Sequence, residues 1–102
     1  MMAGTIAVTP DRRWSAATWL FDWTVEFLAA NVKEPDVKAS LEEIVTENLG
    51  WLGLADYGPD VDIELRELLR SRAVPTADDT FARTMPDREA AIGLLRRLAD
   101  AV

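Results

Sequence analysis

The chain has 102 residues and a formal net charge of −7, and it contains neither cysteine nor histidine. The length fits one domain, residues 1–102, and a hydrophobic content of 49% supplies one apolar core without disulfides. Because thiol and imidazole groups are absent, Ser-His and Cys-His catalysis, thiolate metal sites and ordinary zinc sites are excluded, and we expect no catalytic residue, metal or cofactor.

The first nine residues are expected to form an N-terminal arm. Residues 5–9, Thr-Ile-Ala-Val-Thr, have a β-like composition. This composition favours either a lone strand that pairs with another copy or an ordered arm, and we favour the arm. The segment lacks the basic residues and the long apolar run of a secretory signal, so we expect a cytoplasmic protein.

Residues 10–32 are predicted to form one long helix. Thr9 has the side chain of a helix cap, Pro10 suits the first helical position, and Asp11 suits the positive end of the helix dipole. The helix is expected to end before the Glu34-Pro35 pair, because a residue before proline avoids the α region. Two acidic residues interrupt its apolar stretch, so we expect no membrane span.

This helix contains three of the four tryptophans, and its apolar residues cover most of its circumference. We expect it to lie at the centre of the domain. The alternative is that Trp19, Trp23 and Phe27, spaced i, i+4 and i+8, form an exposed anchor for a partner, because tryptophan is enriched at binding hot spots.

Three further helices are predicted along the rest of the chain: 37–49, capped by Asp36; about 60–73; and one from Pro86 to the C-terminus. A short helical turn carrying Phe81 precedes the last helix, and residues 50–59 are expected to form an apolar, aromatic connection. The pieces predict an all-α fold, a compact bundle of four to five helices.

The negative charge is concentrated in residues 34–64, which carry nine acidic residues and one lysine, a net charge of −8. This segment is either a solvated face that keeps the protein soluble or a surface for a basic protein partner. In the second interpretation Glu43 and Glu47 supply charge, and Trp51 and Tyr57 form the aromatic centre. The negative field disfavours binding of nucleic acid or an anionic membrane.

Two other interpretations of the charged residues are weaker. The acids of Asp60-x-Asp62-x-Glu64 do not follow the order of an EF-hand calcium loop, and the positive end of a helix explains them without a metal. The arginines of the C-terminal third are expected to pair with acids of the same chain, for example Arg66 with Asp62.

The sequence therefore predicts a non-catalytic protein-interaction domain that docks a protein partner through Trp19, Trp23, Phe27, Glu43, Glu47, Trp51 and Tyr57. Small acidic helical domains that neutralise toxins, such as colicin-type immunity proteins, are similar in size and charge but share no motif with this chain. Neutralising or regulating a basic partner, as an immunity protein or antitoxin does, is the specific form of the prediction. The alternative is a structural homo-oligomer, for example a homodimer, closed by the apolar face of helix 10–32.

Overall fold

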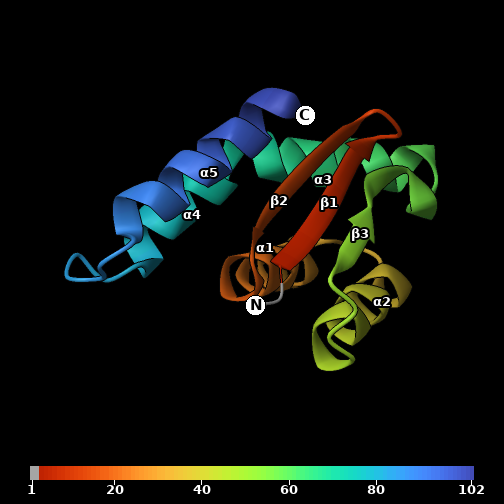
Figure 1. The fold of residues 1–102 in the computed structure, drawn as a ribbon. Coiled ribbons are helices and arrows are strands. Elements are labelled where there is room, and N and C mark those ends of the chain that lie inside the picture. Colours follow the sequence, from red (N-terminus) through yellow and green to blue (C-terminus); the bar gives the residue numbers. More distant parts are fainter. Residues whose placement is uncertain (1–2) are drawn as a thin grey trace.

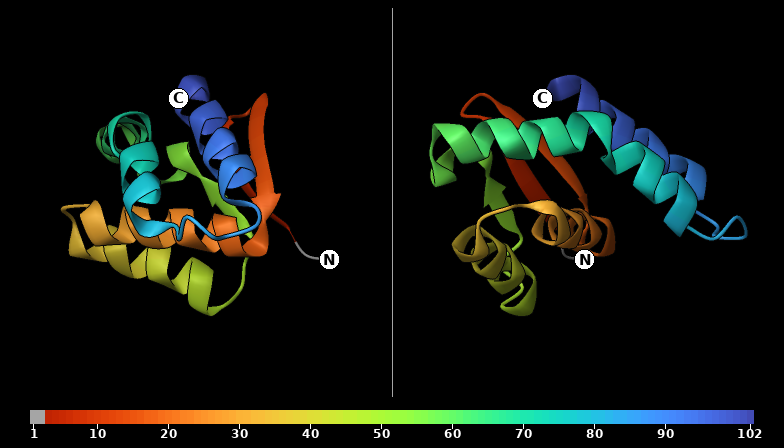
Figure 2. Two further views of the ribbon diagram at one scale, coloured as in Figure 1. Left: turned by 90° about the vertical axis from the view of Figure 1, so that its left-hand side faces the viewer. Right: turned by 180° about the vertical axis from the view of Figure 1, so that it is seen from behind.

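The computed structural model describes residues 3–102, which form a small sheet covered on one face by helices (Figures 1 and 2). The elements follow in the order β1 (Ala3–Thr9), β2 (Arg12–Ala17), α1 (Thr18–Asn31), α2 (Pro35–Thr46), β3 (Trp51–Gly53), the 3-10 helix η1 (Leu54–Tyr57), α3 (Pro59–Ser71), α4 (Ala73–Thr80) and α5 (Arg88–Ala101). The fold is therefore a helix-dominated α/β fold, and the prediction of an all-α bundle is wrong.

The sheet has the order β2-β1-β3. β1 pairs antiparallel with β2, for example Thr5 with Ser15, and parallel with β3, for example Thr5 with Trp51. Residues 3–9 of the predicted N-terminal arm 1–9 are thus the central strand of the sheet, and both of its pairing partners belong to the same chain; residues 1–2 lie outside the described residues. The predicted connection 50–59 contains the third strand and η1.

The first part of the predicted helix 10–32 is a β-hairpin turn followed by β2, and the helix itself begins only at Thr18. The side chains of β2 alternate, with Trp14 and Ala16 buried and Ser15 exposed, which is the period of a strand. The Thr9 hydroxyl accepts a hydrogen bond from the Arg12 backbone N–H at 3.0 Å. Thr9 therefore caps the hairpin turn and not a helix, because Ser/Thr side chains bond nearby N–H groups in both settings.

The other predicted helices are confirmed in type, with shifted ends. α2, α3 and α5 correspond to the helices predicted at 37–49, 60–73 and from Pro86. The short helical turn predicted to carry Phe81 is the longer helix α4, which ends at Thr80, so that Phe81 directly follows it. Pro75 lies in the first turn of α4, where a missing N–H is tolerated. Across residues 3–102, no helix combines the length and the hydropathy needed to cross a bilayer.

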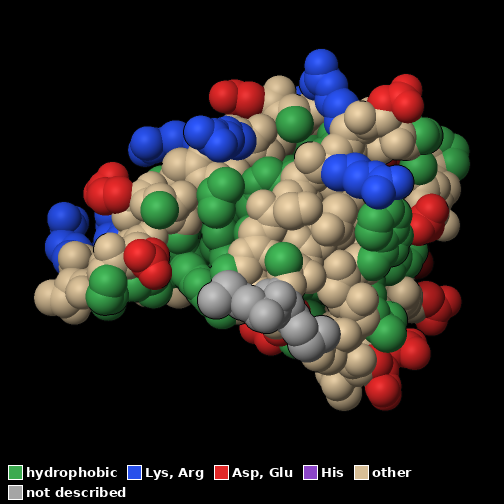
Figure 3. Space-filling view, viewed as in Figure 1, with side chains coloured by type: hydrophobic (Ala, Val, Ile, Leu, Met, Phe, Trp, Pro, Cys, Tyr) green, Lys and Arg blue, Asp and Glu red, His purple; other side chains and the backbone are tan. Residues whose placement is uncertain are grey.

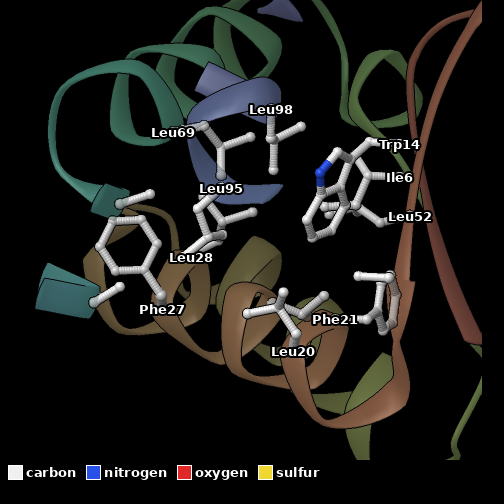
Figure 4. Packing of buried hydrophobic residues seen from close by; sticks show 14 of the residues in the cluster. Ile6, Trp14, Leu20, Phe21, Phe27, Leu28, Leu52, Leu69, Leu95 and Leu98 are labelled. Atoms are coloured by element: carbon white, nitrogen blue, oxygen red, sulfur yellow. The ribbon is translucent and has the colours of Figure 1, made fainter. Parts of the chain in front are cut away.

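The core lies between the sheet and the helices (Figure 4). Large side chains from both layers are almost completely buried, among them Ile6, Leu20, Phe21, Leu28, Leu52, Leu69, Leu95 and Leu98. The sheet approaches α1 most closely at Gly4, where a Cβ atom would lie 2.0 Å from Cγ of Phe21. On the other side, the Trp14 Nε1–H donates to the Leu94 carbonyl at 2.8 Å, which attaches α5 to β2.

All helices lie on one face of the sheet, and the other face is open (Figure 2). The strand residues that point away from the core on β1 and β2 are mostly small, for example Ala7 and Ser15. The side chain of Arg13 can therefore extend from β2 across β1, and its guanidinium lies 5.3 Å from the ring centroid of Trp51 on β3. This cation–π contact spans the width of the sheet.

Candidate protein-interaction surface

The aromatic residues of α1 are packed against one another and against Phe81. The rings of Trp23 and Phe27 are stacked with centroids 5.7 Å apart, and Phe81 makes edge contacts with Trp23 at 5.0 Å and with Trp19 at 5.7 Å. Phe27 is 6% exposed, whereas Trp19 remains 42% exposed. The predicted i, i+4, i+8 anchor is therefore largely covered by the protein's own chain, and so is most of the apolar face that a homodimer through this helix would use.

Arg88 holds Phe81 in this position. Its side chain donates to the backbone carbonyls of Phe81 at 3.3 Å and of Asp78 at 2.9 Å, and it forms an ion pair with the Asp78 carboxylate at 2.8 Å. The hydrogen bond and the positive charge of Arg88 lower the pKa of Asp78 below its ordinary value of 3.8. This cluster ties the end of α4 to the start of α5 and serves the packing of the domain.

The structure brings together the other four predicted residues on a different surface. On α2, Leu41 and Ile44 are buried, whereas Glu43, and Glu47 directly after the last residue of the helix, are exposed. Glu43 and Glu47 lie on the same helical stripe as Ser40, at the i+3 and i+7 positions. The Ser40 hydroxyl lies 2.9 Å from the phenol oxygen of Tyr57 and shares a hydrogen bond with it, so η1 lies beside this stripe.

Leu49 and Trp51 complete this surface at the C-terminal end of α2. The chain turns there through two residues with positive φ, Asn48 at 53° and Gly50 at 68°, and the Leu49 N–H still bonds to the Ile44 carbonyl at 2.9 Å. This turn leaves the Leu49 side chain 58% exposed, and strand alternation leaves Trp51 43% exposed on the open face of the sheet. We call Glu43, Glu47, Leu49, Trp51 and Tyr57 the acidic-aromatic surface.

Two residues of this region were not predicted from the sequence. An exposed leucine gives no signal by itself, and Leu49 stands out only because the turn after α2 leaves its side chain exposed two residues before Trp51. Asp56 folds back toward β3, where a Cβ atom on Gly53 would lie 2.4 Å from its Oδ2. A glycine at position 53 thus leaves room for a further carboxylate beside the strand that carries Trp51.

The acidic character continues beyond this surface onto α3. A hollow of about 530 Å³ beside the end of α1 is lined by three acidic residues, Asp60, Glu64 and Glu67, and by Lys33 and Arg72, around Ile63, which is 66% exposed. An adjoining hollow of about 370 Å³ shares Asp60 and Glu64 and reaches Tyr57. Figure 3 shows most acidic side chains at the right and lower right of the molecule, whereas Lys and Arg side chains, with a few acidic ones among them, lie at the upper left, at the top and at the right centre.

The remaining charged residues bear on two questions, the formation of ion pairs and the binding of a metal ion by acidic side chains. The predicted pair of Arg66 with Asp62 is confirmed, with Nε 3.0 Å from Oδ1, and Arg66 also donates to the Val8 carbonyl. Within the part of the chain that the structure covers, no three acidic side chains are placed so that they could hold one metal ion.

The predicted residues thus divide between two places. Trp19 lies directly after β2, whereas Trp51 belongs to β3 at the opposite edge of the sheet. A single compact partner surface made of all seven residues is not formed, and the acidic-aromatic surface is the larger exposed part. Comparison of the chain with models of known protein families, with curated proteins and with solved structures found no match.

Proposed function

We propose that this protein is a non-catalytic interaction domain that binds a basic protein partner through the acidic-aromatic surface. The observation that supports this best is the pair Leu49 and Trp51, two large apolar side chains that are both exposed and lie two residues apart, in the segment that follows the exposed Glu43 and Glu47. Exposed aromatic side chains supply most of the binding energy at many interfaces, and charges at the rim raise the association rate and select the partner.

The proposed role is neutralisation or regulation of that partner. A protein whose own function depends on a basic surface, for example one that binds an anionic substrate, loses access to its substrate when the acidic-aromatic surface covers that region. The net charge of −7 attracts such a partner over a distance of about one Debye length, roughly 8–10 Å at physiological salt. The complex is therefore expected to weaken as the salt concentration rises.

The experiment compares three variants as baits in pull-downs from the native cell extract, followed by calorimetry with the purified partner. Trp51→Ala is expected to weaken binding about 30-fold or more, the effect of losing a hot spot worth about 2 kcal/mol. The double variant Glu43→Lys with Glu47→Lys is expected to lower the association rate most strongly at low salt.

Trp19→Ala is the matched control, because Trp19 is as exposed as Trp51, 42% against 43%, but lies at the other edge of the sheet. It is expected to leave the affinity within about threefold, less than the 1.4 kcal/mol of a tenfold change. A partner that binds the Trp51 and the Glu43/Glu47 variants as tightly as the unmodified protein would refute the proposal. Light scattering tests the homodimer alternative, for which Trp19 is the main exposed aromatic residue of α1.

A further inference from the structure

The helical layer of this protein is wider than its sheet. β2 is an edge strand whose only strand neighbour within residues 3–102 is β1. α4 and α5 continue past this edge, at the left of Figure 1 and at the right of the rear view in Figure 2. In an antiparallel strand, alternate N–H and C=O groups point away from the paired neighbour, so β2 offers a row of backbone groups on its free side.

Three hollows follow the seam between β2 and α5. The first, about 290 Å³, lies between Ser15 and Arg97; the second, about 190 Å³, lies between Ala17 and Ala90; and the third, about 380 Å³, lies over Gly93. Leu94 lines all three, so they form one continuous depression. We call it the β2–α5 groove, and Figure 3 shows hydrophobic side chains along it between the hairpin and the Arg-bearing helix.

The groove has the dimensions of one missing strand. Its floor on α5 combines the small residues Ala90 and Gly93 with Leu94, and a Cβ atom on Gly93 would meet no atom within 4 Å. The six residues of β2 span roughly 20 Å, and a neighbouring strand would lie about 4.8 Å to the side, over that floor. Trp19 lines one end of the groove and remains 42% exposed.

The charge of the groove is opposite to that of the whole protein. Arg12, Arg13 and Arg97 line its other end, and none of them forms an ion pair with any residue between positions 3 and 102. Asp87 is the one acidic residue among those that line the three hollows. Because the guanidinium of Arg13 lies over Trp51 on β3, the groove presents two available guanidinium groups, those of Arg12 and Arg97, on a protein with a net charge of −7.

We propose that the β2–α5 groove binds an extended acidic segment of a protein partner, which adds to β2 as a fourth strand. Main-chain hydrogen bonds to β2 would supply affinity, as in other cases of strand addition, and alternate side chains would face α5. Carboxylates at one end of the segment pair with Arg12 and Arg97, and an apolar side chain at the other end contacts Trp19. This surface is separate from the acidic-aromatic surface, which lies at the opposite edge of the sheet.

A second copy of this chain fits the groove less well. Its β2 would carry its own Arg12 to a groove that already holds the guanidinium groups of Arg12 and Arg97. Its α5, which extends past its own β2, would also enter the space that the first α5 occupies. A single extended segment without a helix behind it avoids both conflicts.

The test uses the full-length protein labelled with ¹⁵N and three synthetic octapeptides. The first alternates Val and Glu, the second alternates Val and Lys, and the third is the Val/Glu peptide with two consecutive central amides N-methylated, which blocks both of its edges. The Val/Glu peptide is expected to bind at least about tenfold more tightly than either of the others, and its binding should weaken with added salt. Slower hydrogen exchange of alternate β2 amides should accompany it.

Variants of the protein locate the binding site. Arg12→Glu with Arg97→Glu is expected to weaken Val/Glu binding about tenfold or more, whereas Glu43→Lys with Glu47→Lys should leave it within about twofold. The second variant also separates this inference from the proposed function, because it impairs only the acidic-aromatic surface. If the arginine variant loses its helical circular dichroism signal, the inference is tested by the relative affinities of the three peptides for the unmodified protein.

Several results would overturn the inference. Equal binding of the Val/Lys or the N-methylated peptide would show that neither charge nor strand pairing recognises the ligand. An oligothymidylate that bound as tightly, with the same dependence on Arg97, would assign the groove to a nucleic acid. A dimer in sedimentation experiments that dissociated in the Arg97→Glu variant would assign it to a second copy of the chain.

Discussion

Gly4 lies where β1 passes directly over α1, and we predict that Gly4→Ala strongly destabilises the fold. The new Cβ atom would lie 2.0 Å from Cγ, 2.4 Å from Cβ and 2.5 Å from Cδ1 of Phe21. Non-bonded carbons need about 3.5–4.0 Å, so the gap must widen by roughly 1.5 Å. Rotation of the ring cannot achieve this, because the Phe21 Cβ is attached to the backbone, and β1 and α1 must therefore separate.

The size of the effect follows from the packing around this contact. Overpacking a core typically costs about 1–3 kcal/mol, and here a fully buried phenylalanine and a central strand are both displaced. We expect a loss of about 3 kcal/mol in the free energy of unfolding. For a domain of this size that loss corresponds to a fall of about 12 °C or more in Tm.

The assay is urea denaturation followed by far-UV circular dichroism, with Gly93→Ala as the control. Gly93 lies inside α5, and a Cβ atom there meets nothing within 4 Å. The same substitution should therefore stabilise the protein by about 0.5–1 kcal/mol, the difference in helix propensity between glycine and alanine. A loss of less than about 1 kcal/mol for Gly4→Ala, or the same sign for both variants, would refute the packing argument.

Two further predictions concern polar contacts between elements. Trp14→Phe removes the hydrogen bond from Nε1 to the Leu94 carbonyl while keeping an aromatic ring in the core, and it should lower the free energy of unfolding by about 1–3 kcal/mol in urea denaturation; an unchanged value would mean that this bond does not hold α5 to β2. The pKa of Asp78 is lowered from 3.8 by Arg88, so the stabilising effect of this pair is complete above pH 3.8 and is lost as the pH falls through the lower, folded-state pKa. Asp78→Asn should therefore lose stability less steeply than the unmodified protein below pH 3.8, and identical slopes would show that the pair does not contribute to acid unfolding.

The helices that could be predicted from the sequence are those whose signals are local. In α3 and α5, apolar residues recur at helical spacing, and proline or acidic residues mark the N-terminal ends. The buried side of α1 was also predictable, since Phe21, Val25 and Leu28 cluster on one side of a helical wheel and all three are completely buried.

The candidate site was predictable only as separate residues. Glu43 and Glu47 could be placed on one helix face, and Trp51 and Tyr57 stood out as aromatic residues in an acidic segment. Their proximity depends on the Ser40–Tyr57 hydrogen bond, which joins α2 to η1, and on the turn at Asn48 and Gly50. Phe81, conversely, partly covers Trp23 through a contact across more than fifty residues of sequence, and Phe27 stacks on Trp23 and is buried.

By itself the sequence determined that thiol and imidazole groups are absent, that the negative charge is concentrated in residues 34–64, and where most of the helices lie. These features follow from composition and helical periodicity, which depend only on residues close together in the sequence. The tertiary structure alone decided that residues 3–17 form a hairpin and that residues 51–53 join it as a parallel strand. A strand makes its hydrogen bonds with a neighbour and not within itself, so a short segment such as Arg12–Ala17 carries no complete signal of its own. The same dependence on distant partners decided which aromatic side chains lie in the core and which remain available for binding.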